Sequence, residues 1–353
     1  MGAATTASST CSVTSPRILA LVALAALTLS ITGCQSAAPA VPAAPPAAAA
    51  AGAADGKNPP LPKVRMHDAI DATVASMDGV PIRYHVEGSG EPALVFIHGW
   101  SCDRSHWAEQ VERFGAERQV IALDLAGHGQ SGKDRKEWTM ASLGDDVRAV
   151  VLALDVKRVV LIGHSMGGPV ALEAARRMPE RVVAVIGVDT FHDVERHVSA
   201  MQADALLGLW QNDYAGASHK FVESLVPADA DPAIRQRLET QFASAPPDVG
   251  LPILRATFAY DLAAGFDRVH APIRAINTSL ATNVEADRRH CADFAVVDLA
   301  ARHLGHFPML TAPALFDQQL ADVLNGLGVP TAPVAVPVPP GAAAPAPPPR
   351  PAP

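Results

Sequence analysis

Six short runs in the chain are apolar at almost every position rather than at every second position. Strands covered on both faces, as in a parallel sheet, read as continuous apolar runs of this kind. The runs are Ala93–Ile97, Val120–Leu123, Val159–Ile162, Val182–Val188, Ile273–Ile276 and Phe294–Val297. Ile82–Val86 instead alternates apolar and polar residues, so we expect it to be an antiparallel edge strand.

Helical patterns fill several of the segments between these runs. Apolar residues from Met140 to Leu154 recur at helical spacing behind Thr139, a candidate N-cap. Pro313 is placed to open a last helix that Gly326 ends. This alternation predicts an α/β fold with a doubly wound, mostly parallel sheet and helices on both faces. Active sites in such sheets lie at the carboxyl ends of the strands.

A long insertion separates the run that ends at Val188 from the run that starts at Ile273. Its length of about 80 residues is far more than a crossover connection needs. We therefore expect a helical cap at about residues 190–268, with helices over Ala203–Trp210 and Ile234–Phe242. Packing within the cap is the expected role for any single aromatic residue there, although some could line an acyl pocket. These residues are Phe191, Trp210, Tyr214, Phe221, Phe242, Phe258 and Tyr260.

The N-terminal segment reads as an export signal. Arg17 is the only charged residue before Asp55, and the apolar stretch Ile18–Ile31 follows it. That stretch is shorter than the roughly 20 residues of a membrane span. The sequence Ile31–Cys34 resembles a bacterial lipobox, in which Cys34 is lipidated and becomes the first mature residue. An ordinary secretory signal with a chance cysteine is the alternative.

This interpretation divides the chain into four parts. Residues 1–33 are a lipoprotein signal peptide, and residues 34–63 are an Ala/Pro-rich linker. Residues 64–328 form the folded domain, and residues 329–353 are a Pro/Ala-rich disordered tail. A lipid-anchored protein of the cell envelope is expected, at the outer membrane if the source is Gram-negative.

Composition and charge exclude several classes of partner. The formal net charge is −8, and no basic patch interleaved with aromatic residues is present, so nucleic acid is not an expected partner. The folded region contains Cys102 and Cys291, which we expect to be unpaired. The chain has no glycine-rich phosphate loop and no recognisable metal-ligand pattern, so we expect no cofactor and no metal.

Gly163–Gly168, which reads Gly-His-Ser-Met-Gly-Gly, is the stretch most indicative of chemistry. It follows a buried strand and leads into a predicted helix. A serine on such a sharp strand-to-helix turn, between small neighbours, is a nucleophile elbow. Ser165 is therefore the candidate nucleophile. Because a serine hydroxyl is a weak acid, it needs a base within hydrogen-bond reach.

Four motifs together resemble the α/β-hydrolase superfamily, in its group of esterases, haloperoxidases and C–C hydrolases. They are Phe96–Trp100, Asp124–Ser131, Gly163–Gly168 and Gly305–Leu310, and the resemblance extends from Met77 to Leu324. It implies the α/β-hydrolase fold, with a helical cap insertion.

The resemblance also implies roles for individual residues. His306, in the loop after the last strand, would be the base for Ser165. The backbone N–H groups of Trp100 and Met166 would form the oxyanion hole. His98 would brace the loop that carries Trp100, and Asp124 would be structural. Ala126 stands where the family usually has proline.

The acid of the triad departs from the family pattern. Most relatives carry an aspartate just after the strand that ends here at Ile276, but Asn277–Asn283 contains no carboxylate. Asp189, at the end of the preceding strand, occupies the position used by a minority of the superfamily and could orient His306. Glu285, or a dyad without an acid, are the alternatives.

The sequence thus predicts a membrane-tethered serine hydrolase that cleaves a small-molecule ester through an acyl-enzyme. C–C bond hydrolysis or perhydrolysis on the same serine is the alternative within this fold. A binding protein that has lost catalysis on a hydrolase fold is the alternative from another class.

Overall fold

A computed structural model describes residues 69–332. The expected signal peptide, Cys34 and most of the expected linker and tail lie outside the described residues. The first residues of the expected tail are an exception, because Val329 is buried against the core. Ala332 is also held there, since its N–H donates to Glu117 at 2.9 Å and its carbonyl accepts from Arg113 at 2.9 Å. The prediction of a disordered tail from residue 329 is therefore wrong for residues 329–332.

Eight strands form one sheet in the order β1-β2-β4-β3-β5-β6-β7-β8. Pairing is antiparallel between β1 and β2 and between β2 and β4, and parallel between all other neighbours. The predicted mostly parallel sheet is confirmed. The strands are β1 (Ile70–Ala75), β2 (Pro81–Glu87), β3 (Ala93–Ile97), β4 (Val120–Leu123), β5 (Val159–His164), β6 (Val182–Val188), β7 (Ile273–Asn277) and β8 (Phe294–Asp298).

The edge of the sheet differs from the sequence prediction. Ile82–Val86 lies within β2, which is antiparallel as expected but has a neighbour on each side. The edge strand at this end of the sheet is β1, which the sequence analysis missed, and β8 forms the opposite edge. The residues of β1 are mostly exposed or half-buried, and only Val74 is buried, so its apolar pattern is weak.

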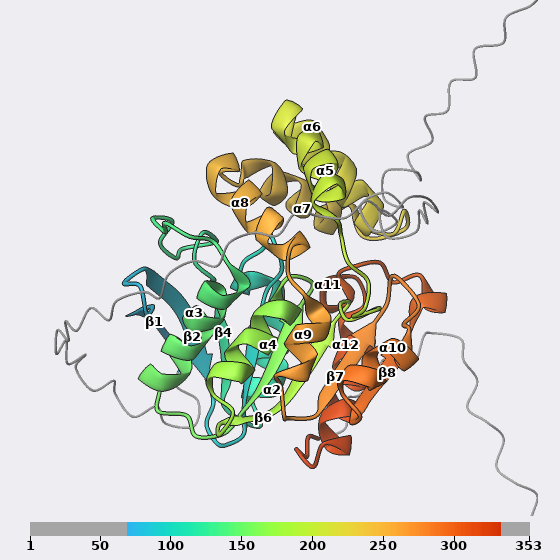
Figure 1. Cartoon of the computed structure of the whole chain (residues 1–353). Helices are drawn as coiled ribbons and strands as arrows, with labels where there is room; N and C mark the ends of the chain where they lie inside the picture. Colours follow the sequence, from blue (N-terminus) through green and yellow to red (C-terminus); the bar gives the residue numbers. More distant parts are fainter. Residues whose placement is uncertain (1–68, 333–353) are drawn as a thin grey trace, which may run out of the picture.

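Helices cover both faces of the sheet, as Figure 1 shows. Helices α3, α4, α9 and α10 lie side by side on one face, while α2 and α12 pack together on the other. The helical segments are η1 (Arg104–Trp107), α2 (Ala108–Gly115), α3 (Met140–Ala153), α4 (Gly167–Arg177), α5 (Ala200–Asn212), α6 (Tyr214–Leu225), α7 (Pro232–Ser244), α8 (Pro247–Phe258), α9 (Leu262–Asp267), α10 (Val284–His290), η2 (Ala300–Arg302), α11 (Pro308–Thr311) and α12 (Pro313–Gly326).

Local sequence signals fix several of these helix ends. Thr139 caps α3, because its hydroxyl accepts from the Ser142 N–H at 2.9 Å and its own N–H donates to the Ser142 hydroxyl at 3.1 Å. This reciprocal pair is a capping box. Helix α12 begins at Pro313 and ends at Gly326, as predicted.

The insertion between β6 and β7 forms a separate layer over one end of the sheet. Helices α5 to α8 gather there in Figure 1, above the sheet and its flanking helices. Helix α9 belongs instead to the lower layer, because it packs against α4 and α10. The cap layer therefore ends at about Phe258, before the boundary near residue 268 that the sequence suggested.

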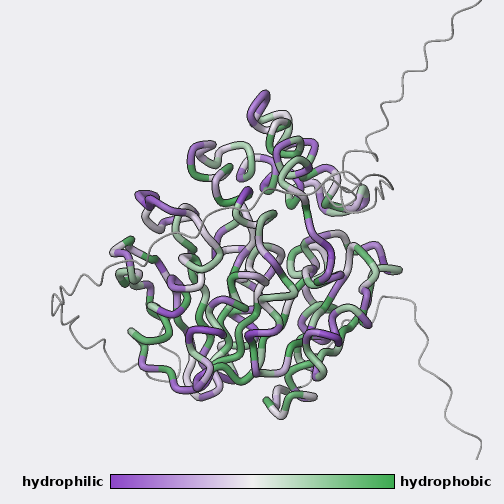
Figure 2. Tube along the Cα trace, viewed as in Figure 1, coloured by the Kyte–Doolittle hydropathy of each residue, from purple (hydrophilic) through white to green (hydrophobic). Residues whose placement is uncertain are grey.

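The core follows the central strands. Every residue of β3, β4 and β5 is buried, and Figure 2 shows hydrophobic segments gathered in the sheet layer. The two cysteines of the described region, Cys102 and Cys291, are both free, as expected.

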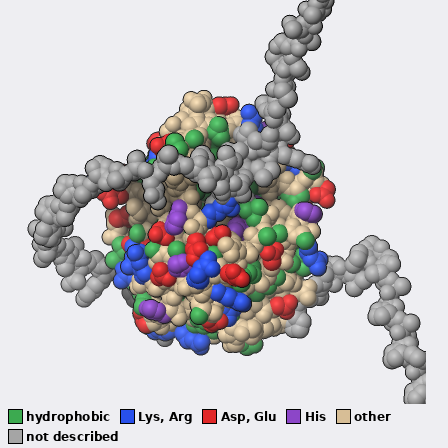
Figure 3. Space-filling view, turned by 45° about the vertical axis from the view of Figure 1, so that its right-hand side comes forward, with side chains coloured by type: hydrophobic (Ala, Val, Ile, Leu, Met, Phe, Trp, Pro, Cys, Tyr) green, Lys and Arg blue, Asp and Glu red, His purple; other side chains and the backbone are tan. Residues whose placement is uncertain are grey.

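The surface is charged without a dominant sign on the face drawn in Figure 3. Acidic and basic side chains are interspersed on that face. Within residues 69–332, none of the helices combines the length and the apolar character that crossing a membrane would require.

Candidate active site

Ser165 lies on a sharp turn between β5 and α4. Its φ is +52°, in the left-handed region that non-glycine residues seldom adopt. Its N–H donates to the Val188 carbonyl of β6 at 3.0 Å, and its own carbonyl closes the turn by accepting from the Gly168 N–H at 2.9 Å. Gly163 permits the turn, because a Cβ there would lie 2.1 Å from the Gly167 carbonyl oxygen. The strand–turn–helix context therefore presents the serine hydroxyl at the carboxyl end of β5.

His306 lies in the loop between η2 and α11, directly beneath the cap. Its N–H donates to the Leu225 carbonyl at the end of α6, at 2.8 Å. The preceding residue, Gly305, has a φ of +74°, and a Cβ there would lie 2.6 Å from the same carbonyl oxygen. Only glycine allows the loop and the cap to approach this closely.

Asp189 follows β6 directly and contacts His306. Its Oδ2 lies 2.5 Å from His306 Nδ1, and its side chain is fully buried. Its φ is +47°, so the chain turns sharply at this residue. The contact that the sequence analysis expected between Asp189 and His306 is present.

The loop after β7 surrounds the Asp189 carboxylate with donors. The N–H groups of Thr278 and Ser279 each donate to Oδ1 at 2.8 Å. The Ser279 hydroxyl donates to Oδ2 at 2.6 Å. The place where most relatives carry the acid thus supplies hydrogen bonds to an acid that lies on the neighbouring strand. The sequence analysis missed this role, because the Thr278 and Ser279 N–H donors are backbone groups that leave no mark in the sequence.

These contacts define the ionisation of the pair. Burial alone would raise the pKa of Asp189, but the hydrogen bond and charge of His306 outweigh it and hold that pKa well below its usual value. A carboxylate only accepts hydrogen bonds, so His306 Nδ1 carries the proton in this contact. Nε2 is the ring nitrogen that this contact leaves available.

Ser165 and His306 line the same cavity. Within residues 69–332, no hydrogen bond joins the Ser165 hydroxyl to His306. Such contacts are often long before a substrate is bound.

Glu285, the alternative acid, is exposed on α10 and is not among the groups that contact His306.

Two backbone N–H groups are available beside the serine. Within the described residues, neither the Trp100 N–H nor the Met166 N–H donates to a protein acceptor. Met166 follows Ser165 at the start of α4. The Trp100 loop lies against the elbow, because a Cβ on Gly99 would be 3.3 Å from Ser165 Cβ. Both donors are therefore close to the nucleophile candidate and unoccupied.

Comparison with known proteins identifies the family. A family model described as the alpha/beta hydrolase fold matches residues 92–292. This chain belongs to the α/β-hydrolase family. The match includes the Ser165 elbow and Asp189 but ends before His306.

The similar proteins differ in how much of their own length matches this chain. Strigolactone esterase RMS3 of Pisum sativum is 28% identical over 276 residues, which are 70% of this chain and 99% of that protein. The dihydrolipoyllysine-residue acetyltransferase component of the acetoin cleaving system of Pseudomonas putida is 34% identical over 160 residues, 44% of this chain. The chain spans only 41% of that protein.

One solved structure is similar over most of this chain. Est816, described as an N-acyl homoserine lactone degrading enzyme, is 27% identical with a TM-score of 0.60. The likeness covers 72% of this chain and 99% of that one.

His98 braces the loop that carries Trp100 in this hydrolase. Its Nδ1 lies 2.7 Å from the Gly99 carbonyl and its Nε2 accepts from the Leu125 N–H at 3.0 Å. Both ring nitrogens are therefore used, one as donor and one as acceptor. Burial lowers the pKa of His98 to about 4, so the ring stays neutral near pH 7.

His164 lies inside the elbow and packs beneath the catalytic candidates. Its Nε2 lies 2.8 Å from the His306 carbonyl, and the two rings are 4.7 Å apart. Burial holds its pKa well below the usual value. His164 thus supports the His306 loop as a neutral ring.

The cavity at Ser165 is small and mostly apolar, with a volume of about 130 Å³. Among the cap aromatics that the sequence analysis named, Phe221, Phe242 and Phe258 line it. Phe191 packs in the core against Phe266 at 5.0 Å, and the Tyr260 hydroxyl donates to Glu173 at 3.1 Å. The lining residues are Gly99, Trp100, Cys102, His164, Ser165, Met166, Phe221, Leu225, Phe242, Leu254, Thr257, Phe258, His306 and Phe307.

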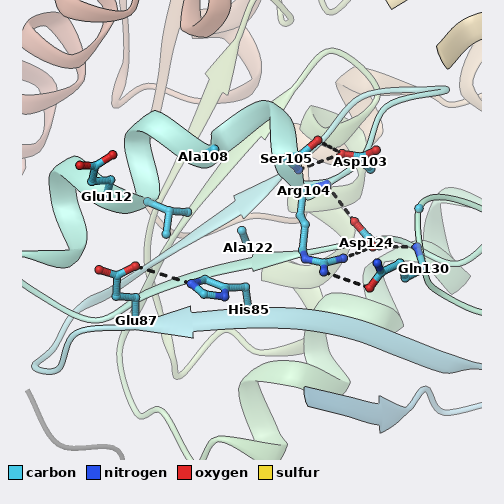
Figure 4. Close-up of a pocket in the computed structure, with 12 residues that line it drawn as sticks. His85, Glu87, Asp103, Arg104, Ser105, Ala108, Glu112, Ala122, Asp124 and Gln130 are labelled. Carbon is cyan, nitrogen blue, oxygen red and sulfur yellow. Dashed lines mark hydrogen bonds and ion pairs between the residues drawn. The ribbon is translucent and has the colours of Figure 1, made fainter. Parts of the chain in front are cut away.

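A second, larger cavity of about 390 Å³ lies between β2 and α2, and Figure 4 shows its side chains. Most of its polar side chains are paired with one another. Arg104 forms an ion pair with Asp124 and donates to Gln130 at 3.1 Å. His85 lies 3.6 Å from Glu87, away from the Ser105 hydroxyl, which donates to Asp103. In this cavity, therefore, the Ser105 hydroxyl is not paired with a histidine.

Proposed function

We propose that this α/β-hydrolase cleaves carboxylic esters of small molecules through an acyl-enzyme, with Ser165 as nucleophile, His306 as base and Asp189 as the acid that orients His306. The observation that carries the proposal is the 2.5 Å contact between Asp189 and His306 Nδ1, beside a serine that lines the same cavity. The left-handed backbone of Ser165 supports it, because such strain is maintained chiefly at functional sites.

Acylation would begin with attack of Ser165 Oγ on the ester carbonyl carbon. His306 Nε2 accepts the serine proton as the carbon–oxygen bond forms, and Asp189 stabilises the imidazolium without taking the proton itself. The tetrahedral intermediate carries its negative charge on the former carbonyl oxygen. The N–H groups of Trp100 and Met166 would donate to that oxygen, and one such donor typically contributes about 3–4 kcal/mol.

Collapse of the intermediate would break the bond to the alcohol oxygen, which leaves with the proton from His306. A water molecule then gives a proton to His306 Nε2 and attacks the acyl-enzyme carbonyl. The second intermediate releases the carboxylic acid, and the proton returns to Ser165. His306 thus acts once as base and once as acid in each half of the cycle.

The printed descriptions of similar proteins support ester chemistry. One relative is named as an esterase, and Est816 is described as degrading a lactone, which is a cyclic ester. A panel of open-chain esters and lactones is therefore the appropriate first screen.

The decisive experiment compares the wild-type protein with Ser165→Ala. A fluorophosphonate probe should label the wild type at Ser165 and leave the variant unlabelled. Ester turnover should fall by about four to six powers of ten, as in other serine hydrolases that lose the nucleophile. Retention of most p-nitrophenyl ester turnover by a folded Ser165→Ala variant would contradict the proposal. A wild type that neither reacts with the probe nor turns over esters would support a binding protein instead.

We also propose that the hydrolase is exported and anchored in the cell envelope by a lipid on Cys34. The support is the lipobox-like sequence Ile31–Cys34 behind an apolar stretch. Cys34→Ala should shift the protein out of the membrane fraction or stall its precursor, while the released domain keeps its ester turnover. Mass spectrometry that finds an unmodified N-terminus at another residue would contradict the anchor.

A further inference from the structure

The cavity at Ser165 is small for a ligand site. Its volume is about 130 Å³, whereas sites for drug-sized ligands usually measure roughly 300–1,000 Å³. An apolar protein cavity of about 150 Å³ takes up a single benzene molecule. One aromatic ring, or a chain of about six carbon atoms, would therefore fill the space beside the nucleophile.

The walls of the cavity are fixed by contacts outside it. The Trp100 indole N–H donates to the Gly250 carbonyl in α8 at 2.8 Å. Its ring packs edge-on against Trp210 and Phe242, with centroids 5.6 and 5.7 Å away. Phe307 is fully buried and packs against Phe242 at 6.3 Å. Because these aromatic groups interlock across the loop after β3 and the cap, a longer group could enter only by displacing several of them.

The residues that line the cavity also provide no charged side chain that could pair with a charged group on a substrate. Among the residues that line it, no Lys, Arg, Asp or Glu occurs. The Thr257 hydroxyl is already paired with the Ile253 carbonyl at 2.9 Å. The Cys102 thiol is paired with the Trp100 carbonyl at 3.3 Å. A carboxylate or phosphate on the buried group would lose its hydration without gaining a partner.

The reaction order decides which half of the ester occupies the cavity. The alcohol must leave before water attacks the acyl-enzyme, whereas the acyl group stays bound to Ser165 throughout. The half that stays attached is the half suited to an enclosed space.

We infer that this site selects esters whose acyl group is uncharged, apolar and no larger than about six carbon atoms or one phenyl ring. The inference rests on the proposed function. Butanoyl, hexanoyl and benzoyl groups fit the space, while octanoyl and longer chains, and acyl groups with a terminal carboxylate, do not.

Two matched series of 4-methylumbelliferyl or simple alkyl esters test this selection. In the first, the acyl chain lengthens from acetyl to dodecanoyl with one alcohol. The kcat/KM should rise about fourfold for each added methylene, the value of burying a CH₂ group, up to about six carbons. It should then fall at least tenfold at octanoyl. In the second, the alcohol lengthens on a fixed butanoyl group, and kcat/KM should change by less than about threefold for each methylene.

Cap variants sharpen the test. Phe221→Ala removes a half-buried wall residue of α6, and the ratio of octanoyl to butanoyl kcat/KM should rise at least tenfold. Leu209→Ala is the matched control, since Leu209 is 39% exposed on α5 and does not line the cavity. Its octanoyl to butanoyl ratio should equal that of the wild type. Phe258→Ala, on α8, provides a second enlargement if Phe221→Ala does not fold.

The outcomes separate the inference from the function on which it rests. Equal kcat/KM values for butanoyl and dodecanoyl esters would overturn the size selection while leaving ester hydrolysis intact. An unchanged octanoyl to butanoyl ratio in both folded enlargement variants would also overturn it. Failure of every ester, together with failure of the fluorophosphonate probe to label Ser165, would overturn the proposed function and the inference with it.

Discussion

Two groups of loops at the carboxyl ends of neighbouring strands bury polar side chains but use them differently. After β3 and β4, His98, Arg104 and Asp124 form a brace in which the partners are all protein groups. Both His98 nitrogens are used, and the Asp124 oxygens accept from the N–H groups of Arg104 and Gln130 at 2.8 and 2.9 Å.

The second group, after β5 and β6 and before α11, is the triad candidate formed by Ser165, Asp189 and His306. Here the Asp189 carboxylate is fully paired. Within residues 69–332, however, His306 Nε2, the Ser165 hydroxyl and the N–H groups of Trp100 and Met166 have no protein partner. A buried polar network can act on a substrate only where some of its donors and acceptors face a cavity and have no protein partner. The two groups should therefore respond oppositely to isosteric substitutions.

The largest expected effect is that of Asp189→Asn on turnover. The amide would favour the wrong His306 tautomer, and in serine proteases that change lowers kcat by about 10⁴-fold. The free energy of unfolding should change by less than about 2 kcal/mol, because Ser279 and His306 can exchange donor and acceptor roles with an amide of the same shape. Steady-state kinetics and urea unfolding measure the two quantities. Near-normal kcat in the folded variant would remove Asp189 from the triad.

The reverse pattern is expected from Asp124→Asn. It breaks a half-buried ion pair with Arg104 and places an amide opposite the backbone N–H groups that Asp124 accepts from, so the free energy of unfolding should fall by about 2–3 kcal/mol. At a temperature where the variant is still folded, kcat/KM should stay within about tenfold of the wild type. A loss of turnover as large as that of Asp189→Asn, without a loss of stability, would erase the distinction between the brace and the triad candidate.

Low pH should destabilise the folded protein, because His98 in the brace and the neighbouring His128 are buried as neutral rings. Burial lowers the pKa of His98 to about 4 and that of His128 to about 3, below the value of about 6.5 in an unfolded chain. As pH falls below about 6.5 the unfolded state binds protons first, so stability falls, by about 3 kcal/mol for His98 alone by pH 4.

The Asp189 carboxylate acts in a lower pH window. Its pKa is depressed in the folded state, so its contribution is present above the unfolded value of about 3.9 and is lost only below it. Urea unfolding at pH 8, 7, 6, 5 and 4.5 should therefore show a flat region above pH 7 and a decline that His128→Asn makes shallower. A constant free energy of unfolding from pH 7 to 4.5 would contradict neutral burial of these rings.

The smallest effect is expected from Ser279→Ala. It deletes one of the hydrogen bonds to the Asp189 carboxylate, the 2.6 Å contact to Oδ2, and hydrogen bonds to charged groups are typically worth about 1.5–3 kcal/mol. The kcat should fall by about tenfold, with KM nearly unchanged. Ser279→Thr keeps the hydroxyl and should restore most of the loss. An equal loss in both variants would indicate that loop packing, rather than the hydrogen bond, is responsible.

The sequence was most informative where burial is complete. Five of the six apolar runs became β3 to β7, which have a neighbouring strand on each side, and the sixth became the edge strand β8, which is mostly half-buried. Strand β1 was missed because it is largely exposed. Helix α8 contains Pro252, a residue that argues against a helix interior, so its pattern gave no prediction.

The site was partly accessible to the same reasoning. Ser165 is marked by its glycines, and Asp189 could be proposed because it ends a strand beside the elbow. The hydrogen bonds from Thr278 and Ser279 to Asp189 could not be derived from the sequence. They depend on how the loop after β7 folds over the end of β6. The division of cap aromatics between the cavity wall and the core was equally inaccessible, since it depends on the packing of helices that are distant in sequence.

The position of Asp189 has a consequence for protein engineering. Asp189 and Phe191, with φ values of +47° and +58°, turn the chain out of β6 and into the cap insertion. A chimera that receives a foreign cap directly after Val188 would lose Asp189 together with the native cap. A junction placed after Phe191 would keep Asp189 with the scaffold that carries Ser165 and His306 and leave the cap helices exchangeable.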